Sequence, residues 1–211
     1  GGSSTRTADI NSGNVAGNTV IVAAKLGNSN DFFKIETMQV KVGVLVTPIA
    51  IDLNGNGLDT VALAGSTGKF DLFGNGSEVK SGWLSKDDGF LAIDANHNGK
   101  IDGINELFGG NNAGEGFAEL IAFDSNGDLV VSASDAHFLD LSVWRDSNGN
   151  HKTDAGELMN LTQASVVSLS VDYDSANTFW DAQGNQHLEH STATLADGHV
   201  VDMTDINFAV A

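Results

Sequence analysis

Hydrophobic and polar residues change their pattern near the only proline of the chain, Pro48. Residues 1–31 are rich in Gly, Ser, Asn and Thr and contain one apolar run, Val20–Ala24. In residues 32–46 apolar and polar positions partly alternate, as in a half-buried β-strand. Two strands do not form a stable domain alone. We therefore expect residues 1–47 to be an N-terminal strand extension or a linker from a preceding domain, and residues 48–211 to be the folded domain.

After Pro48, short apolar segments are separated by loops of Asp, Asn and Gly. Helical periodicity is brief and is confined to residues 114–123, 134–141 and 155–164. Residues 166–210 instead have the pattern of strands joined by turns. We expect an α+β fold: an irregular, loop-rich, calcium-stabilised domain with EF-hand-like loops, short helices and C-terminal antiparallel strands.

The charge and composition of the chain exclude several classes of function. Among 211 residues, 10 Lys and Arg stand against 28 Asp and Glu, which gives a net charge of -18. Such a surface repels nucleic acid and anionic membranes. The chain contains no Cys, which excludes disulfides and thiolate chemistry, and no apolar run long enough to insert into a membrane. We expect a monomeric module of a larger chain.

The Asp-Asn-Gly loops fit the way proteins bind calcium. Calcium takes about six to eight oxygen ligands, and an EF-type loop supplies them from positions 1, 3, 5, 7, 9 and 12, with Gly at position 6. One such segment is also an ordinary turn, because Asp, Asn and Gly favour turns. Four of them in one acidic chain favour bound calcium, and we expect three to five ions.

The clearest loop runs from Asp146 to Glu157. His151 stands at position 6, which predicts a histidine in left-handed backbone conformation. The predicted ligands are Asp146, Asn148, Asn150, the Lys152 carbonyl, Asp154 and Glu157.

Three further loops follow the pattern less completely. The loop from Asp94 has its acid one residue late, the loop from Asp124 has Leu129 at position 6, and the loop from Asp52 has no acid at position 12. A fifth candidate from Asp71 is degraded, because Phe73 occupies a ligand position. The predicted ligands are Asp52, Asn54, Asn56 and Asp59; Asp94, Asn96, Asn98, the Lys100 carbonyl, Asp102 and Glu106; and Asp124, Asn126, Asp128, the Val130 carbonyl and Asp135.

Many of these ligands are Asn, so each site carries little charge. Low ligand charge predicts weak calcium sites, on the order of 10⁻⁴–10⁻³ M, the range of extracellular modules. We therefore expect a secreted or cell-surface protein that folds after export.

Two other groups of polar residues lie outside the loops. Asp87, Asp88 and Gly89 form either a plain turn or, with Glu106, an additional calcium or ligand site. His187 and His190 are three residues apart on a predicted strand, so their side chains are expected on opposite faces and not at one metal.

Several segments together resemble a calcium-binding module of large RTX proteins of Gram-negative bacteria. They are residues 48–57, Ser81–Trp83, residues 87–99, Glu106–Gly109 and residues 143–148. In the FrpC-like branch, the resemblance implies a module that cleaves an Asp-Pro bond at its own N-terminal edge. In giant RTX adhesins, it implies a calcium-dependent domain that binds C-terminal carboxylates of peptides.

The chain departs from the self-processing branch at one position. That chemistry needs Asp directly before Pro, because its side-chain carboxylate attacks its own carbonyl carbon and forms an anhydride. Here the residue is Thr47, whose hydroxyl cannot form that anhydride. We therefore expect no enzyme activity.

Four functions remain open from the sequence. The first is an adhesion module, active in biofilm or host contact, that binds a peptide or protein on a host or neighbouring cell through a calcium site near Asp87, Asp88, Gly89 and Glu106. The others are a glycan-binding module, a calcium-stiffened spacer and a self-processing module. None of them involves nucleic acid or insertion into a membrane.

Overall fold

The computed structural model describes residues 45–110 and 112–211, and its compact unit runs from Leu45 to Ala211. The strand expected at Val20–Ala24 and most of the one expected in 32–46 lie outside the described residues. Thr47 and Pro48 belong to the first strand, β1 (Thr47–Ile51). Within the described ranges no helix has the length and apolar character needed to cross a bilayer.

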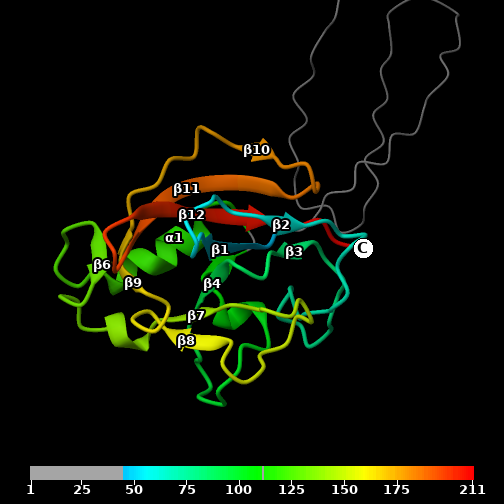
Figure 1. Ribbon diagram of the computed structural model, residues 1–211, viewed down its shortest axis with the longest axis horizontal. Coiled ribbons are helices and arrows are strands. Elements are labelled where there is room, and N and C mark those ends of the chain that lie inside the picture. Colours follow the sequence, from blue (N-terminus) through cyan, green and yellow to red (C-terminus); the bar gives the residue numbers. More distant parts are fainter. Residues whose placement is uncertain (1–44, 111) are drawn as a thin grey trace, which may run out of the picture. The chain divides into compact units, whose positions relative to one another are not determined.

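The predicted α+β class is wrong, because the unit is mostly antiparallel β-structure (Figure 1). The main sheet curls into a half-barrel with the order β6-β9-β11-β12-β1-β4-β7-β8. The short β10 pairs with β11 and β5 pairs with β1. The strands besides β1 are β4 (Gly89–Ala92), β5 (Gly109–Gly110), β6 (Val130–Ser132), β7 (Ser142–Trp144), β8 (Leu158–Asn160), β9 (Val166–Ser170), β10 (Phe179–Trp180), β11 (Gln186–Leu195) and β12 (Val200–Asn207), while β2 (Thr60–Val61) and β3 (Trp83–Leu84) form a separate two-stranded sheet.

Helical structure is scarce among the described residues. The α-helix is α1 (Glu115–Leu120), and three 3₁₀ turns accompany it: η1 (Ile104–Glu106), η2 (Ile121–Phe123) and η3 (Phe138–Asp140). The helix predicted within 155–164 is absent, because Leu158–Asn160 pairs as β8 with β7. The predicted C-terminal strands and the turns between them are confirmed as β9–β12.

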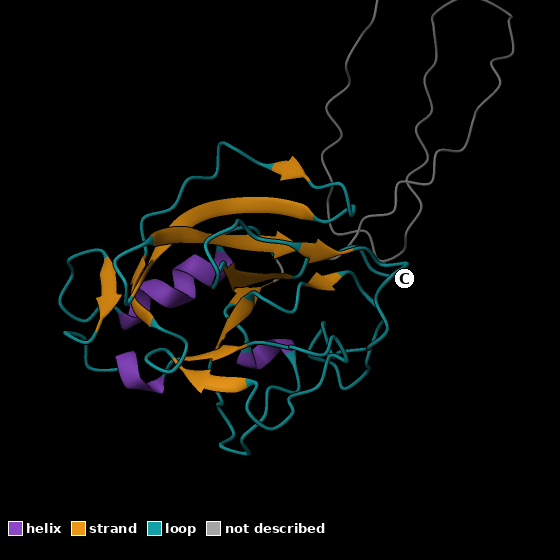
Figure 2. Cartoon of the chain, viewed as in Figure 1, coloured by secondary structure: helices purple, strands orange, loops and turns teal. Residues whose placement is uncertain are grey.

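The central strands are buried on both faces of the sheet. Ile49 and Ile51 of β1 belong to one hydrophobic cluster, and Ala50 between them belongs to the other. Successive side chains of a strand point to opposite faces, so a run of apolar residues is buried throughout. Helix α1 packs against β1 on the first face through Phe117 and Leu120 (Figure 2).

The second face is covered by aromatic side chains and loops instead of a helix. Trp83, Phe90, Trp144 and Phe208 pack there, with ring centroids 4.9–5.9 Å apart. The loops from Asp52 and Asp146 connect strands, whereas the loop from Asp124 follows the short helical segment α1–η2 and the loop from Asp94 runs into η1. None of these loops has a helix on both sides, as an EF-hand has. The loops nevertheless keep a common local geometry.

Candidate metal centre and adjoining pocket

The first Asp of each predicted loop organises the main chain around its carboxylate. In the loop from Asp146, one carboxylate oxygen accepts the N–H of Gly149 at 2.8 Å and the other accepts the N–H of His151 at 2.8 Å. The loops from Asp52, Asp94, Asp124 and Asp71 make the same bond to the residue at position 6, at 2.8–2.9 Å. These bonds hold each loop in a tight turn around position 1.

Positions 4 and 6 of every loop have left-handed backbone conformation. Glycine adopts it at little cost, whereas other residues pay a steric penalty. Three loops nonetheless place a side chain there, including His151 as predicted. The residues at these positions are Gly55 and Gly57, Gly74 and Gly76, His97 and Gly99, Gly127 and Leu129, and Gly149 and His151, with φ between 56° and 95°.

Side chains at positions 3 and 5 turn their oxygens back into the loop. In the loop from Asp146, Asn148 accepts the N–H of Asn150 at 3.0 Å, and Asn150 accepts the N–H of Lys152 at 2.8 Å. Asn96, Asn98, Asn126, Asp128 and Asn54 make equivalent bonds at 2.8–3.0 Å. The amide N–H groups of Asn148 and Asn150 donate to Asp154.

A carboxylate closes three of the loops at corresponding places. Glu157 accepts the N–H of Ser147 at 2.9 Å and that of Asp154 at 2.9 Å. Asp135 accepts the N–H groups of Ser125 and Ser132 at 2.8 and 2.9 Å. The Ser132 N–H is the main cause that lowers the pKa of Asp135.

Glu106 closes the loop from Asp94 although it stands one residue late. It accepts the N–H of Asp102 at 3.0 Å, the bond that Glu157 makes to Asp154. Glu106 is fully buried, and its other oxygen, Oε1, has no hydrogen-bond partner in the described part of the chain. A buried carboxylate oxygen without a partner fits a cation ligand.

The donor set fits calcium only with help from amides and carbonyls. In the part of the chain that the structure describes, no three His, Cys, Asp or Glu side chains gather closely enough to hold a metal. Asn amides and the predicted carbonyls of Lys100, Val130 and Lys152 would have to complete each site. Calcium accepts such neutral oxygens readily.

The predicted ligand group of Asp87, Asp88, Gly89 and Glu106 is divided between different places. Asp87 is exposed and pairs with Lys86 at 3.0 Å. Asp88 is buried against the loop from Asp52, where it accepts the N–H of Asp59 at 3.0 Å. Glu106 belongs to the Asp94 loop and, among the described residues, makes no hydrogen bond with either Asp.

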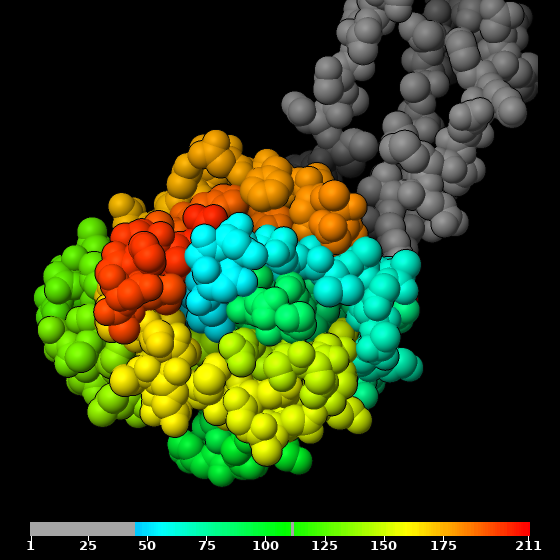
Figure 3. All heavy atoms as spheres, viewed as in Figure 1, coloured from blue at the N-terminus to red at the C-terminus, as the bar shows by residue number. Residues whose placement is uncertain are grey.

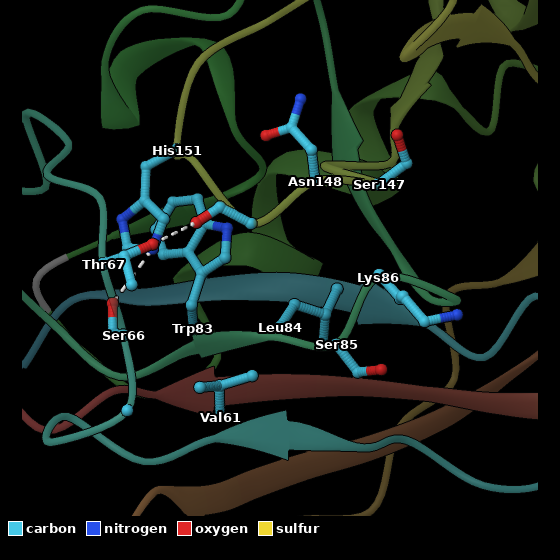
Figure 4. A pocket seen from close by; sticks show the side chains of 12 residues that line it. Val61, Ser66, Thr67, Trp83, Leu84, Ser85, Lys86, Ser147, Asn148 and His151 are labelled. Atoms are coloured by element: carbon cyan, nitrogen blue, oxygen red, sulfur yellow. Dashed lines mark hydrogen bonds between the residues drawn. The ribbon is translucent and has the colours of Figure 1, made fainter.

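A pocket of about 380 Å³ lies beside the Asp146 loop (Figure 4). Figure 4 shows Ser66 and Thr67 on one side and Lys86 on the other, with Trp83 and Leu84 between them. Ser147, Asn148 and Gly149 of the loop contribute to the wall. The sequence did not predict this pocket, because its walls come from four separate segments.

Trp83 and His151 join the pocket wall to the loop. The Trp83 indole N–H donates to Asp146 at 2.9 Å, and its ring stacks on His151 with centroids 3.9 Å apart. His151 Nε2 lies 3.0 Å from the Ser66 hydroxyl. Burial lowers the pKa of His151 to about 4, so the imidazole is neutral at pH 7.

A second buried acidic group lies at the start of β1. Burial, and then the charge of Glu189, raise the pKa of Asp205 to about 8. Asp205 accepts the N–H of Gly114 at 3.4 Å, and the Thr47 side chain acts against the rise of its pKa. Glu189 and Asp205 each keep one oxygen that has no hydrogen-bond partner among the described residues. Nothing in the sequence pattern separated these two residues from other polar residues on strands.

The sequence matches a protein family and is similar to the protein FrpA. Residues 49–209 match the SPM domain family. Over 170 residues the chain is 39% identical to the iron-regulated protein FrpA of Neisseria meningitidis serogroup C. The aligned region is 77% of this chain and only 15% of FrpA. Both matches agree with the resemblance to an RTX-associated module, and neither concerns calcium or a ligand.

Proposed function

The chain belongs to the SPM domain family, and from this premise we propose that it is a calcium-dependent ligand-binding module of an exported RTX-type adhesin. Its ligand is the C-terminal carboxylate end of a peptide or protein on a host or neighbouring cell. The carboxylate binds in the pocket beside the Asp146 loop. The module folds outside the cell, where calcium is abundant.

Charge complementarity supports a carboxylate ligand at this pocket. A chain with a net charge of -18 repels carboxylates unless a local cation attracts them. Lys86 is the cationic residue of the pocket, and the Asp146 loop adjoins its wall. An ion in that loop and the Lys86 ammonium would supply positive charge at two edges of one cavity.

The rest of the pocket suits the end of a peptide. Ser66, Thr67 and Ser85 offer hydroxyl groups, and Val61 and Leu84 offer apolar surface. A binding pocket of this kind buries an apolar side chain and fixes its orientation with a few polar groups. We therefore expect selectivity for the last side chain of the peptide.

The bond from Trp83 to Asp146 carries the proposal. Asp146 is position 1 of the clearest loop, and its carboxylate also fixes the main chain of His151. Any ion that orders Asp146 therefore orders two walls of the pocket. Ligand binding should then require calcium even if the ligand never touches the ion.

A peptide-binding experiment tests this function. Peptides from a C-terminal library are measured with free and with amidated C-termini, in millimolar calcium and in chelator. We expect binding only for the free acids in calcium. Lys86→Gln should weaken it about tenfold, the loss of one charge-assisted contact. Lys69→Gln removes the same charge from an exposed site outside the pocket and should change nothing.

Two outcomes would contradict the proposal. Equal binding of acid and amide peptides would exclude recognition of the carboxylate. Absence of binding by folded, calcium-loaded protein would favour a glycan-binding module or a calcium-stiffened spacer.

A second candidate function is self-processing, blocked in this chain by Thr47. The observation that favours it is the buried pair Glu189 and Asp205 beside the Thr47–Pro48 bond. With a pKa of about 8, Asp205 keeps a proton at neutral pH. It could give that proton to the proline nitrogen when the bond breaks.

Thr47→Asp tests the second candidate. The new carboxylate would attack its own main-chain carbonyl carbon, forming a cyclic anhydride as the C–N bond to Pro48 breaks. We expect a mass loss corresponding to residues 1–47 in millimolar calcium. Thr47→Asn has similar size but no carboxylate and should stay intact. An unchanged mass of the folded Thr47→Asp variant would reject this function.

A further inference from the structure

The loop from Asp52 lacks a closing acid within its own segment. Position 12 is Leu63, whereas Glu157 and Asp135 occupy that position in two other loops and Glu106 stands one residue later in a third. Asp52 otherwise behaves as position 1. Its carboxylate accepts the N–H groups of Gly55 at 2.7 Å and Gly57 at 2.8 Å.

We propose that Asp88 is the missing acid, and that Asp52, Asn54, Asn56 and Asp88 form a calcium site assembled from two segments of the chain. Asp88 lies 36 residues beyond Asp52 in the sequence. This role differs from the one that the sequence suggested for Asp88, a ligand-binding residue beside Glu106. The existence of this calcium site can be tested without any peptide ligand.

Asp88 contacts its loop in a way that resembles the other closing acids. Glu157 and Asp135 each bridge the N–H of position 2 and the N–H of position 9. Asp88 accepts the N–H of Asp59, at position 8, at 3.0 Å, and the N–H of Leu53, at position 2, favours its charged form. It therefore faces the same part of its loop, one position earlier, although it comes from another segment.

One oxygen of Asp88 has no partner. The residue is 1% exposed, Oδ2 accepts the Asp59 N–H, and Oδ1 makes no hydrogen bond within residues 45–110 and 112–211. Leaving a buried polar atom unsatisfied destabilises a fold, so such an atom calls for an explanation. Glu106, the closing acid of the Asp94 loop, has the same kind of free oxygen.

The charge around Asp88 also favours a cation. Burial, and then the negative charges of Asp52 and Asp59, disfavour the ionised form of the Asp88 carboxyl group. A divalent ion between Asp52 and Asp88 would offset this repulsion and use the free oxygen. Asn54 and Asn56 would add neutral oxygens, as at positions 3 and 5 of the other loops.

The sheet itself brings the two segments together. β1 and β4 are antiparallel, and Ile51 lies opposite Gly89. Asp52 follows Ile51 and Asp88 precedes Gly89, so the two Asp residues lie side by side at the end of this strand pair. Figure 3 shows the cyan atoms of the segment after β1 against the blue-green atoms of the segment before β4. An ion here would clamp the end of β1 to the start of β4.

Calcium stoichiometry with the intact chain tests the site. Bound calcium is counted by equilibrium dialysis for the wild type, Asp88→Asn and the matched control Asp87→Asn. Asp87 is exposed and pairs with Lys86, so its variant should keep the full count. Asp88→Asn should lose one equivalent of calcium, and Glu157→Gln should lose a different one, so the double variant should lose two.

A melting experiment separates a calcium ligand from a merely structural residue. In chelator, Asp88→Asn should melt at the wild-type temperature or above, because it removes a buried charge and keeps the shape. In millimolar calcium it should melt below the wild type. Loss of stability equal in both buffers, or a calcium count equal to the wild type, would overturn the proposal.

Discussion

Unpartnered oxygens on buried carboxyl groups are the main feature at the scale of single residues. Among the residues that the structure describes, four acidic side chains carry one: Asp88, Glu106, Glu189 and Asp205. Asp88 and Glu106 close Asp-Asn-Gly loops, where a cation would satisfy them. Glu189 and Asp205 lie on neighbouring strands away from these loops, where a retained proton satisfies the pair at neutral pH.

Asp205→Asn should remove a pH dependence of stability. The folded pKa of about 8 lies above the unfolded value of 3.8, so this stability is full below pH 4 and is lost as pH rises through 8. Between pH 7 and 9 the wild type should lose about 1 kcal/mol more than the variant. Urea unfolding in calcium across this range measures it.

Asp202→Asn is the matched control for that measurement. Asp202 lies on the same strand and is exposed, so its variant should lose stability with pH as the wild type does. Parallel pH curves for all three proteins would contradict the assignment of a proton to Asp205.

At the scale of elements, five loops share one backbone while their side chains differ. Leu129 and His151 occupy the same left-handed position 6, with φ of 67° and 62°. Leu129 is 52% exposed, whereas His151 is buried against Trp83 and Ser66. Leu129 therefore has the steric cost of the left-handed conformation without a compensating contact from burial, whereas the packing of His151 offsets that cost.

Substitution by glycine should have opposite effects at these two positions. Leu129→Gly removes the steric cost and should raise the free energy of unfolding by about 0.5–1 kcal/mol. His151→Gly loses the ring stacking and the Ser66 contact, and should lower it by about 1–2 kcal/mol. Urea unfolding of both variants in saturating calcium checks this, and changes of the same sign would contradict it.

The elements also explain what could be predicted from the sequence. The conformation of each loop depends on neighbouring residues in the sequence. The spacing of Asp, Asn and Gly therefore predicted the turns and the left-handed conformation of His151. Strand pairing is not local: residues 158–160 look helical until β7 lies beside them. The bulge in β11 likewise brings His187 and His190 onto one side, with both rings stacked near Phe179, against the expectation of opposite faces.

The same limit applies to the candidate sites. The closing acids Glu157, Asp135 and Glu106 follow their loops within about a dozen residues, so spacing alone could find them. Asp88 and the Trp83 pocket depend on segments that only the folded sheet brings together. Composition predicted an acidic chain with Asp-Asn-Gly loops, and calcium binding remains a prediction; composition contained no information about which segments meet.

At the scale of the whole molecule, a charge of -18 on 211 residues opposes compaction. Two kinds of cation could relieve it. Ordinary salt screens exposed charges without binding, whereas calcium bound at the loops adds the free energy of each site. The two effects make different predictions at equal ionic strength.

Calcium should stabilise the protein far more than NaCl of the same ionic strength. With a dissociation constant of about 10⁻³ M, tenfold excess calcium adds about 1.4 kcal/mol per site, so three to five sites add several kcal/mol. Magnesium should do less, because it holds its water and demands a stricter octahedral geometry. Melting temperatures in chelator, in each salt and in calcium give the comparison. If NaCl stabilised the protein as much as calcium does, the loops would be turns without bound ions, and the proposed peptide binding would not depend on calcium. A stabilisation specific to calcium would mean that the protein is most stable in the calcium-rich medium outside the cell.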